Sequence, residues 1–263
     1  MHKKIISLDN KEIKNIIKLI TKSKTRREER IFVVEGQKEI LMAIKNRFKF
    51  QKIYYNSNII DINNLKFDNN TQIIEVNNEV YSKISFRNST EGIIGLVEIK
   101  QNSNTNLNSK KINLALVLDG LEKPGNIGAI LRSCDASAVD IVILTNEKCD
   151  IHNPNVIRSS IGTFFSNNVI SMSNEEALEF LKNNNFKIYG TSLNATQYYN
   201  SIQYNSSTAL IAGSENNGIS DFWIKNSDIL IKIPMLGIAD SLNVSVSSAI
   251  CLSEINRQNK FNR

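Results

Sequence analysis

The chain is poor in the residues that build disulfide frameworks and metal sites. Its 263 residues include three cysteines and two histidines. The cysteines lie far apart and form no Cys-x-x-Cys pair, which disfavours both a disulfide framework and a redox motif. With so few cysteine and histidine ligands, a zinc site is not expected. We therefore predict a functional site without a metal.

Long apolar runs are also missing. No stretch of 18 apolar residues occurs, although 41% of the residues are hydrophobic. We therefore expect buried cores but no membrane-spanning helix and no membrane partner. Residues 1–10, MHKKIISLDN, lack the apolar segment of a signal peptide. These absences predict a cytoplasmic protein.

The glycine-rich motifs of nucleotide-binding loops are absent as well. No Walker pattern occurs. Residues 121–137, LEKPGNIGAILRSCDAS, contain two glycines, Gly125 and Gly128. Lys123 stands where a dinucleotide-binding motif would begin. This disfavours a nucleotide-dependent oxidoreductase or synthetase. The polar turn must therefore serve another ligand.

Positive charge is abundant in the first part of the chain only. The net charge is +6, and residues 1–105 hold 19 Lys and Arg against 12 Asp and Glu. The remaining residues hold 13 against 14. A basic part beside a near-neutral part is typical of a domain that holds a polyanion and a domain that acts on it. Solvated lysine faces are also common, so charge alone does not decide for nucleic acid.

The order of apolar patterns predicts two α/β domains. Residues 1–105 form a small basic domain, residues 101–110, QNSNTNLNSK, a linker, and residues 111–263 a second domain. Strands and helices alternate in the second domain, which predicts a mostly parallel sheet with helices on both faces. The expected strands are 31–36, 52–56, 72–76, 92–99, 114–118, 140–144, 186–192, 208–213 and 229–234, and the expected helices are 11–22, 37–44, 175–184, 241–257 and one from Asn126.

Three polar loops follow predicted strands of the second domain. They are PGNIGAILR (124–132), IAGSENNGIS (211–220) and IPMLGIADSLNVSVSSAI (233–250). Ligands of open α/β sheets bind where the strands end, so these loops are the candidate site. In the helix of the first loop, Arg132 lies off the apolar face and is either a solvated surface residue or a ligand-facing cation. That face consists of Ile127, Ile130, Leu131 and Cys134.

Together and in this order, the three loops resemble the motifs of the SpoU (TrmH-like) ribose 2′-O-methyltransferases of the SPOUT superfamily. Residues 1–105, with RIFVVEGQKEI and NSTEGIIGLV, look like the substrate-binding domain that precedes the catalytic domain in many members. The resemblance implies an S-adenosylmethionine-dependent enzyme that methylates a ribose 2′-hydroxyl in RNA. It also implies a trefoil-knotted catalytic domain and a homodimer formed through that domain. The N-terminal domain favours ribosomal (23S) RNA as substrate; a tRNA enzyme and a non-catalytic RNA-binding protein are the alternatives.

The resemblance further implies roles for single residues. Because a guanidinium stays protonated, we expect Arg132 to stabilise the developing oxyanion and to hold a phosphate instead of acting as a base. Glu215 is expected to fix the arginine or a loop amide, whereas Ser241 and Asn243 also read as ordinary helix caps. The implied catalytic residues are Asn126, Arg132, Glu215, Ser241 and Asn243, and the implied cofactor-binding residues are Thr191, Ser192, Leu193, Gly213, Ile233, Met235 and Leu242.

Cations of the first domain are the expected RNA contacts. They follow a predicted helix whose lysines occupy one face and whose isoleucines occupy another. One further arginine, in the segment after the first loop, is expected to touch RNA across the dimer. The predicted RNA-binding residues are Lys22, Lys24, Arg26, Arg27, Arg30 and Arg158.

Overall fold

The chain forms two compact units in a computed structural model. One unit is Met1–Gln101 with Asp150–Ser166, and the other is Asn102–Cys149 with Asn167–Arg263. The predicted linker, 101–110, lies outside the described residues, so the predicted domain boundary stays a prediction. The structure describes residues 3–86, 91–100 and 112–259.

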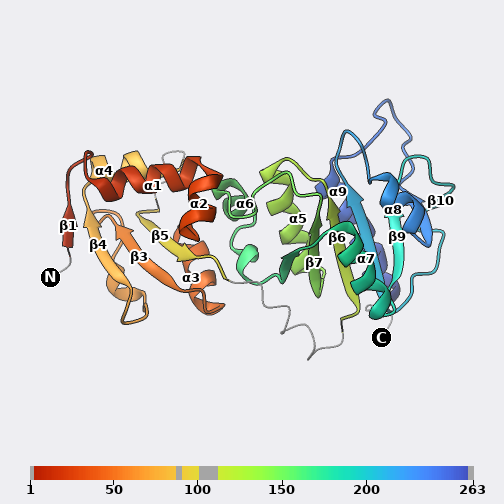
Figure 1. The fold of residues 1–263 in the computed structure, drawn as a ribbon, viewed down its shortest axis with the longest axis horizontal. Helices are drawn as coiled ribbons and strands as arrows, with labels where there is room; N and C mark the ends of the chain where they lie inside the picture. Colours follow the sequence, from red (N-terminus) through yellow and green to blue (C-terminus); the bar gives the residue numbers. More distant parts are fainter. Residues whose placement is uncertain (1–2, 87–90, 101–111, 260–263) are drawn as a thin grey trace. The chain divides into compact units, whose positions relative to one another are not determined.

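The first unit is built on a five-stranded mixed sheet with the strand order β1-β4-β3-β5-β2. Strand β5 runs antiparallel to β2 and β3, whereas β4 pairs in parallel with β1 and β3. Helix α1 buries Ile13, Ile16 and Leu19 in the core of this unit. The elements, shown in Figure 1, are β1 (Lys3–Ile5), α1 (Lys11–Thr21), α2 (Ser23–Glu29), β2 (Ile31–Glu35), α3 (Gln37–Lys45), β3 (Phe50–Tyr55), η1 (Ile62–Asn64), β4 (Gln72–Val76), α4 (Asn78–Ile84) and β5 (Ile93–Glu98).

A distant segment completes this first unit. Asp150–Ser166 carries the short helices α6 (Pro154–Ser159) and η3 (Thr163–Phe165). The buried ring of Phe32 on β2 packs against His152 and Phe164, with ring centroids 4.9 and 5.9 Å apart. Because the core of the unit includes this segment, a fragment that ends near residue 105 would leave Phe32 exposed.

Arg26 is a structural residue of the first unit, and its prediction as an RNA contact is wrong. Its side chain is only 2% exposed. Its Nε donates to Asp150 Oδ2 at 2.7 Å, and its Nη1 donates to the carbonyl of Leu19 at 2.6 Å. Although burial raises the pKa of Asp150, hydrogen bonds from His152 and the charge of Arg26 lower it to about 2. The guanidinium therefore has no face left for a phosphate.

Arg26→Ala is expected to lower the free energy of unfolding of the first unit by about 3–5 kcal/mol, because removal of one partner leaves the other as an unpaired buried charge. Arg27→Ala is the matched control, since Arg27 is exposed on the same helix, and we expect a change within about 0.5 kcal/mol. Urea unfolding followed by far-ultraviolet circular dichroism measures both. Equal stabilities of the two variants would contradict the buried pair.

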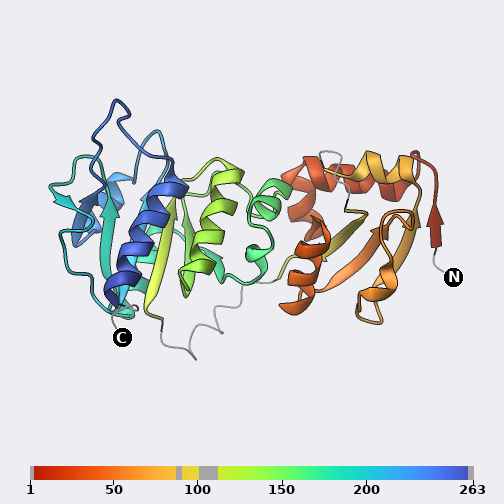
Figure 2. The same cartoon turned by 180° about the vertical axis from the view of Figure 1, so that it is seen from behind.

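The second unit contains a seven-stranded sheet with the order β10-β12-β9-β11-β6-β7-β8, in which every described pair is parallel. Helices α7 and α8 pack on one face, and α5 and α9 on the other (Figures 1 and 2). This confirms the predicted parallel sheet with helices on both faces, whereas the trefoil knot stays a prediction. The elements are β6 (Leu114–Asp119), α5 (Pro124–Ala136), β7 (Ile141–Thr145), β8 (Val169–Ser171), α7 (Asn174–Asn183), β9 (Lys187–Thr191), β10 (Gln197–Tyr198), β11 (Thr208–Gly213), α8 (Asp221–Asn226), β12 (Ile229–Lys232) and α9 (Val244–Asn259).

None of the helices in the described residues has the length and the apolar run that crossing a bilayer requires. The longest, α9, has 16 residues, whereas a span needs about 20. Across the same residues, no three His, Cys, Asp or Glu side chains gather where they could hold a metal ion. Cys134 and Cys251 are buried thiols.

Candidate active site

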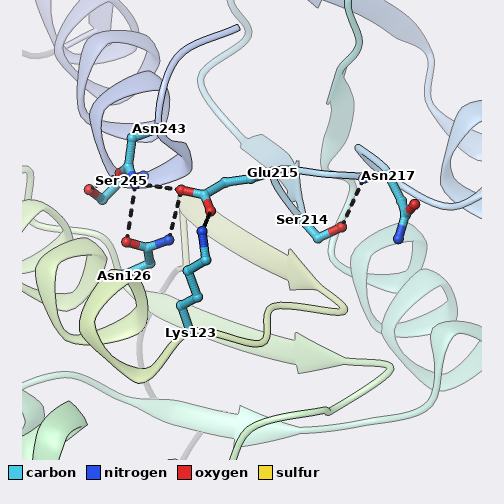
Figure 3. A network of polar contacts seen from close by, with 7 residues as sticks. All are labelled: Lys123, Asn126, Ser214, Glu215, Asn217, Asn243 and Ser245. Atoms are coloured by element: carbon cyan, nitrogen blue, oxygen red, sulfur yellow. Dashed lines mark hydrogen bonds and ion pairs between the residues drawn. The ribbon is translucent and has the colours of Figure 1, made fainter.

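The three polar loops meet at one edge of the second sheet. Strands β6 and β11 are parallel neighbours, and their register places Gly213 beside Asp119, so both end at this edge. Helix α5 begins soon after β6, and the loop that carries Glu215 begins directly after β11. The segment before α9 approaches them from the other side (Figure 3). This is the carboxyl edge, where ligands of parallel sheets bind.

The carboxylate of Glu215 is the centre of a polar network that joins the three loops (Figure 3). Its Oε1 accepts from Asn126 Nδ2 at 3.0 Å and from Asn243 Nδ2. The two asparagines also bind each other, because Asn243 Nδ2 donates to Asn126 Oδ1 at 3.2 Å. The structure thus brings together three of the five predicted catalytic residues.

Lys123 is a fourth member of the network that the sequence did not reveal. Its ammonium group forms an ion pair with Glu215 Oε2. Lys123 lies directly before α5, and its side chain is mostly exposed, whereas Glu215 is mostly buried. The sequence shows a lysine in a turn that also holds Gly125 and Gly128, but nothing in the sequence placed this lysine beside a glutamate 92 residues away.

The network keeps Glu215 ionised. The hydrogen bond from Lys123, followed by that from Asn126, holds the pKa of this carboxyl below its usual value of 4.5, although burial opposes the shift. For a carboxyl with a lowered pKa, the stabilising contacts are present above the unfolded pKa and are lost as pH falls through the folded one. Between pH 6 and 9 Glu215 is therefore a constant negative charge.

We expect Glu215→Gln to lower the rate of the methyl transfer that the resemblance implies by about 10- to 100-fold, because a hydrogen bond to a charged group contributes about 1.5–3 kcal/mol. The shape of the rate profile between pH 6 and 9 should not change, since Glu215 does not titrate there. Glu254→Gln is the matched control, because Arg257 lowers the pKa of that carboxyl outside the network. If the rise or the fall of the rate with pH disappeared in Glu215→Gln, Glu215 would titrate in this range, which would contradict its role as a constant negative charge.

Asn243 has two functions in the structure. Its Oδ1 accepts from the backbone N of Ser245 at 3.0 Å and from Ser245 Oγ at 2.6 Å, so it caps the first turn of α9. Its Nδ2 faces Glu215 and Asn126. Asn243 is therefore both a helix cap and a member of the polar network. The helix begins at Val244 and not at Ser241 as predicted.

The other two predicted catalytic residues lie outside the network. Arg132 is exposed on α5 and, among the described residues, has no hydrogen-bond or ion-pair partner; the face behind it is buried as predicted. Ser241 is exposed, and its Oγ lies 3.5 Å from Asp240 Oδ1. Ser241 lines the cavity described next.

A cavity of about 300 Å³ opens beside Glu215. Apolar side chains such as Ile219, Ile231 and Val244 form much of its wall, and hydroxyl, amide and charged side chains form the rest. Such a mixture, at the lower end of the usual volume range of about 300–1,000 Å³, is typical of small-molecule and cofactor sites. All seven predicted cofactor-binding residues line it: Thr191, Ser192, Leu193, Gly213, Ile233, Met235 and Leu242.

These residues fit S-adenosylmethionine in chemistry, because the cavity offers apolar walls, hydroxyl groups and one carboxylate. Gly213 is needed for the wall itself. A Cβ at this position would lie 2.0 Å from the backbone C and O of Gly218. A larger residue at Gly213 would therefore displace the loop before it filled the cavity.

The remaining predicted RNA contacts are all exposed residues of the first unit. Lys24 lies 3.7 Å from Glu28, an exposed pair that leaves its ammonium group accessible. Such surface pairs contribute little and exchange readily for a phosphate. The exposed cations are Lys22, Lys24, Arg27, Arg30 and Arg158.

Two family descriptions match the sequence. The SpoU rRNA Methylase family matches residues 113–253, which include the network and the cavity. The MRM3-like substrate binding domain matches residues 10–95. The two matches cover most of the chain in the order that the resemblance of the loops implied.

Known proteins are similar over almost the whole length. The 23S rRNA (guanosine(2553)-2'-O)-methyltransferase RlmP of Bacillus subtilis is 28% identical over 250 residues, 94% of this chain and 97% of the relative. A crystal structure of an RNA 2'-O ribose methyltransferase is 32% identical, with a TM-score of 0.85 over 97% of this chain and 98% of its own. An AdoMet-bound rRNA methyltransferase from Sinorhizobium meliloti is 26% identical, with a TM-score of 0.88 over 97% of both chains. The chain belongs to the SpoU rRNA methylase family and is an S-adenosylmethionine-dependent RNA 2′-O-methyltransferase.

Proposed function

We propose that this enzyme methylates a ribose 2′-hydroxyl of 23S ribosomal RNA. The observation that carries the proposal is the joint placement of the Glu215 network and the cofactor cavity at one sheet edge. The Bacillus relative, which acts on 23S rRNA, supports the choice of substrate because the similarity includes the N-terminal domain. A ribosomal RNA substrate also favours the cytoplasm as the site of action.

The cavity residues would hold the cofactor, which supplies a methyl group when bound. Thr191 Oγ1 donates to the carbonyl of Ile211 at 2.9 Å, which fixes its side chain at the cavity wall. Residues Ser214 to Ile219, in the loop after Gly213, form another side of the cavity. These groups are held before any ligand binds, so little ordering cost accompanies binding.

Arg132 is the proposed cation for the reacting hydroxyl. The 2′-hydroxyl must lose a proton as its oxygen forms the bond to the methyl carbon, and a nearby guanidinium stabilises the negative charge that develops. Because a guanidinium does not give up its proton in proteins, the proton leaves to a phosphate oxygen or to water. The planar fork of Arg132 can hold a neighbouring phosphate at the same time.

The network around Glu215 has a positioning role in this proposal. It fixes the start of α5, which carries Arg132, against the loop that lines the cavity and against the cap of α9. Residues 1–105 are proposed to bind the RNA through exposed cations, and residues 111–263 to form a homodimer. Sedimentation of the full chain measures the oligomeric state.

Mapping of 2′-O-methylated nucleotides in cells with and without the gene tests the substrate. We expect one 2′-O-methylation to disappear from 23S rRNA in the deletion strain and to return with the wild-type gene, but not with Arg132→Ala. If the lost methylation lies in tRNA, and all ribosomal sites are unchanged, the proposed substrate is wrong.

A further inference from the structure

Asp119 is a buried carboxylate that the active-site network does not include. It is the last residue of β6 and is 3% exposed. Its Oδ1 accepts from Asn146 Nδ2 at 2.6 Å and from Thr145 Oγ1 at 3.3 Å, and its Oδ2 accepts from the backbone N of Ser220 at 2.6 Å. No cation among the described residues pairs with it. A buried charge is costly unless hydrogen bonds satisfy it, so three convergent donors at one carboxylate require a reason.

The hydrogen bonds of Asp119 close a loop. The backbone of Asp119 is the register partner of Gly213, where the loop begins, and its carboxylate binds Ser220, where the loop ends. Between these points the chain folds back tightly, with Gly218 N donating to the carbonyl of Ser214 at 2.8 Å. Both ends of the loop 214–220 are thus held by the same residue of the neighbouring strand.

This loop carries the functional groups of the site. Glu215 lies within it, and its residues from Ser214 to Ile219 line the cofactor cavity. We propose that Asp119 is a positioning residue, which holds the loop 214–220 in the shape that forms the cavity wall and directs Glu215 towards Asn126. The inference rests on the proposed assignment of this cavity to S-adenosylmethionine.

The chemistry of the contact explains why a carboxylate occupies this position. Two oxygens face two sides, one towards Ser220 and the other towards Asn146 and Thr145. An asparagine has one oxygen and one amide group. Asp119→Asn can therefore keep the bond to Ser220 with its oxygen and donate to Thr145 Oγ1, at the cost of the bond from Asn146. Asp119→Ala loses all three bonds.

The experiment compares cofactor affinity and turnover in the full chain. We expect Asp119→Ala to weaken S-adenosylmethionine binding by about tenfold or more in calorimetry. It should also lower kcat, because Glu215 loses its position, while KM for RNA stays unchanged. Asp119→Asn should recover most of the affinity. Ser220→Ala is the matched control, because it removes a side-chain hydroxyl and keeps the backbone N that donates to Asp119. This variant should bind the cofactor like the wild type.

Amide hydrogen exchange of the wild-type enzyme tests the contact without any substitution. The amide of Ser220 should exchange slowly, whereas that of the exposed Asn216 should exchange fast. A fast Ser220 amide, or wild-type affinity and rate in folded Asp119→Ala, would overturn the inference. If wild-type enzyme gives no heat with S-adenosylmethionine, the cofactor assignment fails, whatever the variants show.

Discussion

Arg132→Ala is expected to lower the single-turnover rate of methyl transfer by about 10²–10³-fold, the usual effect of removing one preorganised donor to a developing oxyanion. The affinities for RNA and S-adenosylmethionine should change far less, because the lost interaction is formed mainly in the transition state. Arg132 is exposed, and the apolar face of α5 behind it is buried, so the helix should remain intact. The rate is measured as the transfer of tritium from labelled S-adenosylmethionine to RNA, with RNA at a saturating concentration.

Two further variants separate the role of this arginine from that of any surface cation. Arg132→Lys should recover little activity, because a point charge cannot reproduce the planar fork that holds phosphate and oxygen together. Arg257→Ala removes an exposed arginine of α9 that pairs with Glu254, and it should leave the rate unchanged. A near-wild-type rate in Arg132→Ala would mean that Arg132 is a solvated surface residue without a role in methyl transfer.

A triple charge reversal of Lys22, Lys24 and Arg27 to Glu is expected to weaken RNA binding on the order of 10²-fold at low salt. Each lost phosphate contact also reduces the counterions released on binding. The slope of log K against log salt concentration should therefore fall by about 2–3. Arg26 is left unchanged in this variant because it is buried in its pair with Asp150. Filter binding over a salt series measures affinity and slope together.

The matched control reverses three exposed cations at the end of α3 and beyond it, Lys45, Arg47 and Lys49. It changes the net charge by the same amount at another place in the first unit. We expect a smaller loss of affinity and a nearly unchanged slope. Equal losses in the two triple variants would mean that net charge, and not the surface around α2, determines RNA binding.

The parts of the fold that follow from local pattern were predictable. Apolar runs such as Leu114–Asp119 and Thr208–Gly213 are buried parallel strands, as expected, and the three loops after them meet at one edge. The starts of two helices differ from the predicted ones, because the residues of the first turn and of the cap determine where a helix begins. Helix α5 begins at Pro124, since proline suits the first turn, and α9 begins after its cap Asn243. Short elements such as α8 and β10 are too brief for periodicity to reveal.

Contacts between distant residues were not predictable from local pattern. Nothing in the sequence near Arg26 shows that its guanidinium binds Asp150, 124 residues later. The same holds for Lys123 and Glu215, and for Asp119 and Ser220. In each case the sequence supplies a charged residue of the right type, but only tertiary structure decides whether it faces solvent, a ligand or a partner. The packing of residues 150–166 in the first unit was likewise not predictable, because it depends on contacts with residues far away in the sequence.

The most direct measurement is the position of the label after incubation of purified enzyme with tritiated S-adenosylmethionine and 23S rRNA. A ribose 2′-O-methyl group blocks alkaline cleavage at its own nucleotide, so labelled RNA should yield one labelled alkali-resistant dinucleotide. Arg132→Ala should yield almost none in the same time. Label that is released in mononucleotides would show methylation of a base, and the absence of label from every RNA offered would contradict the account.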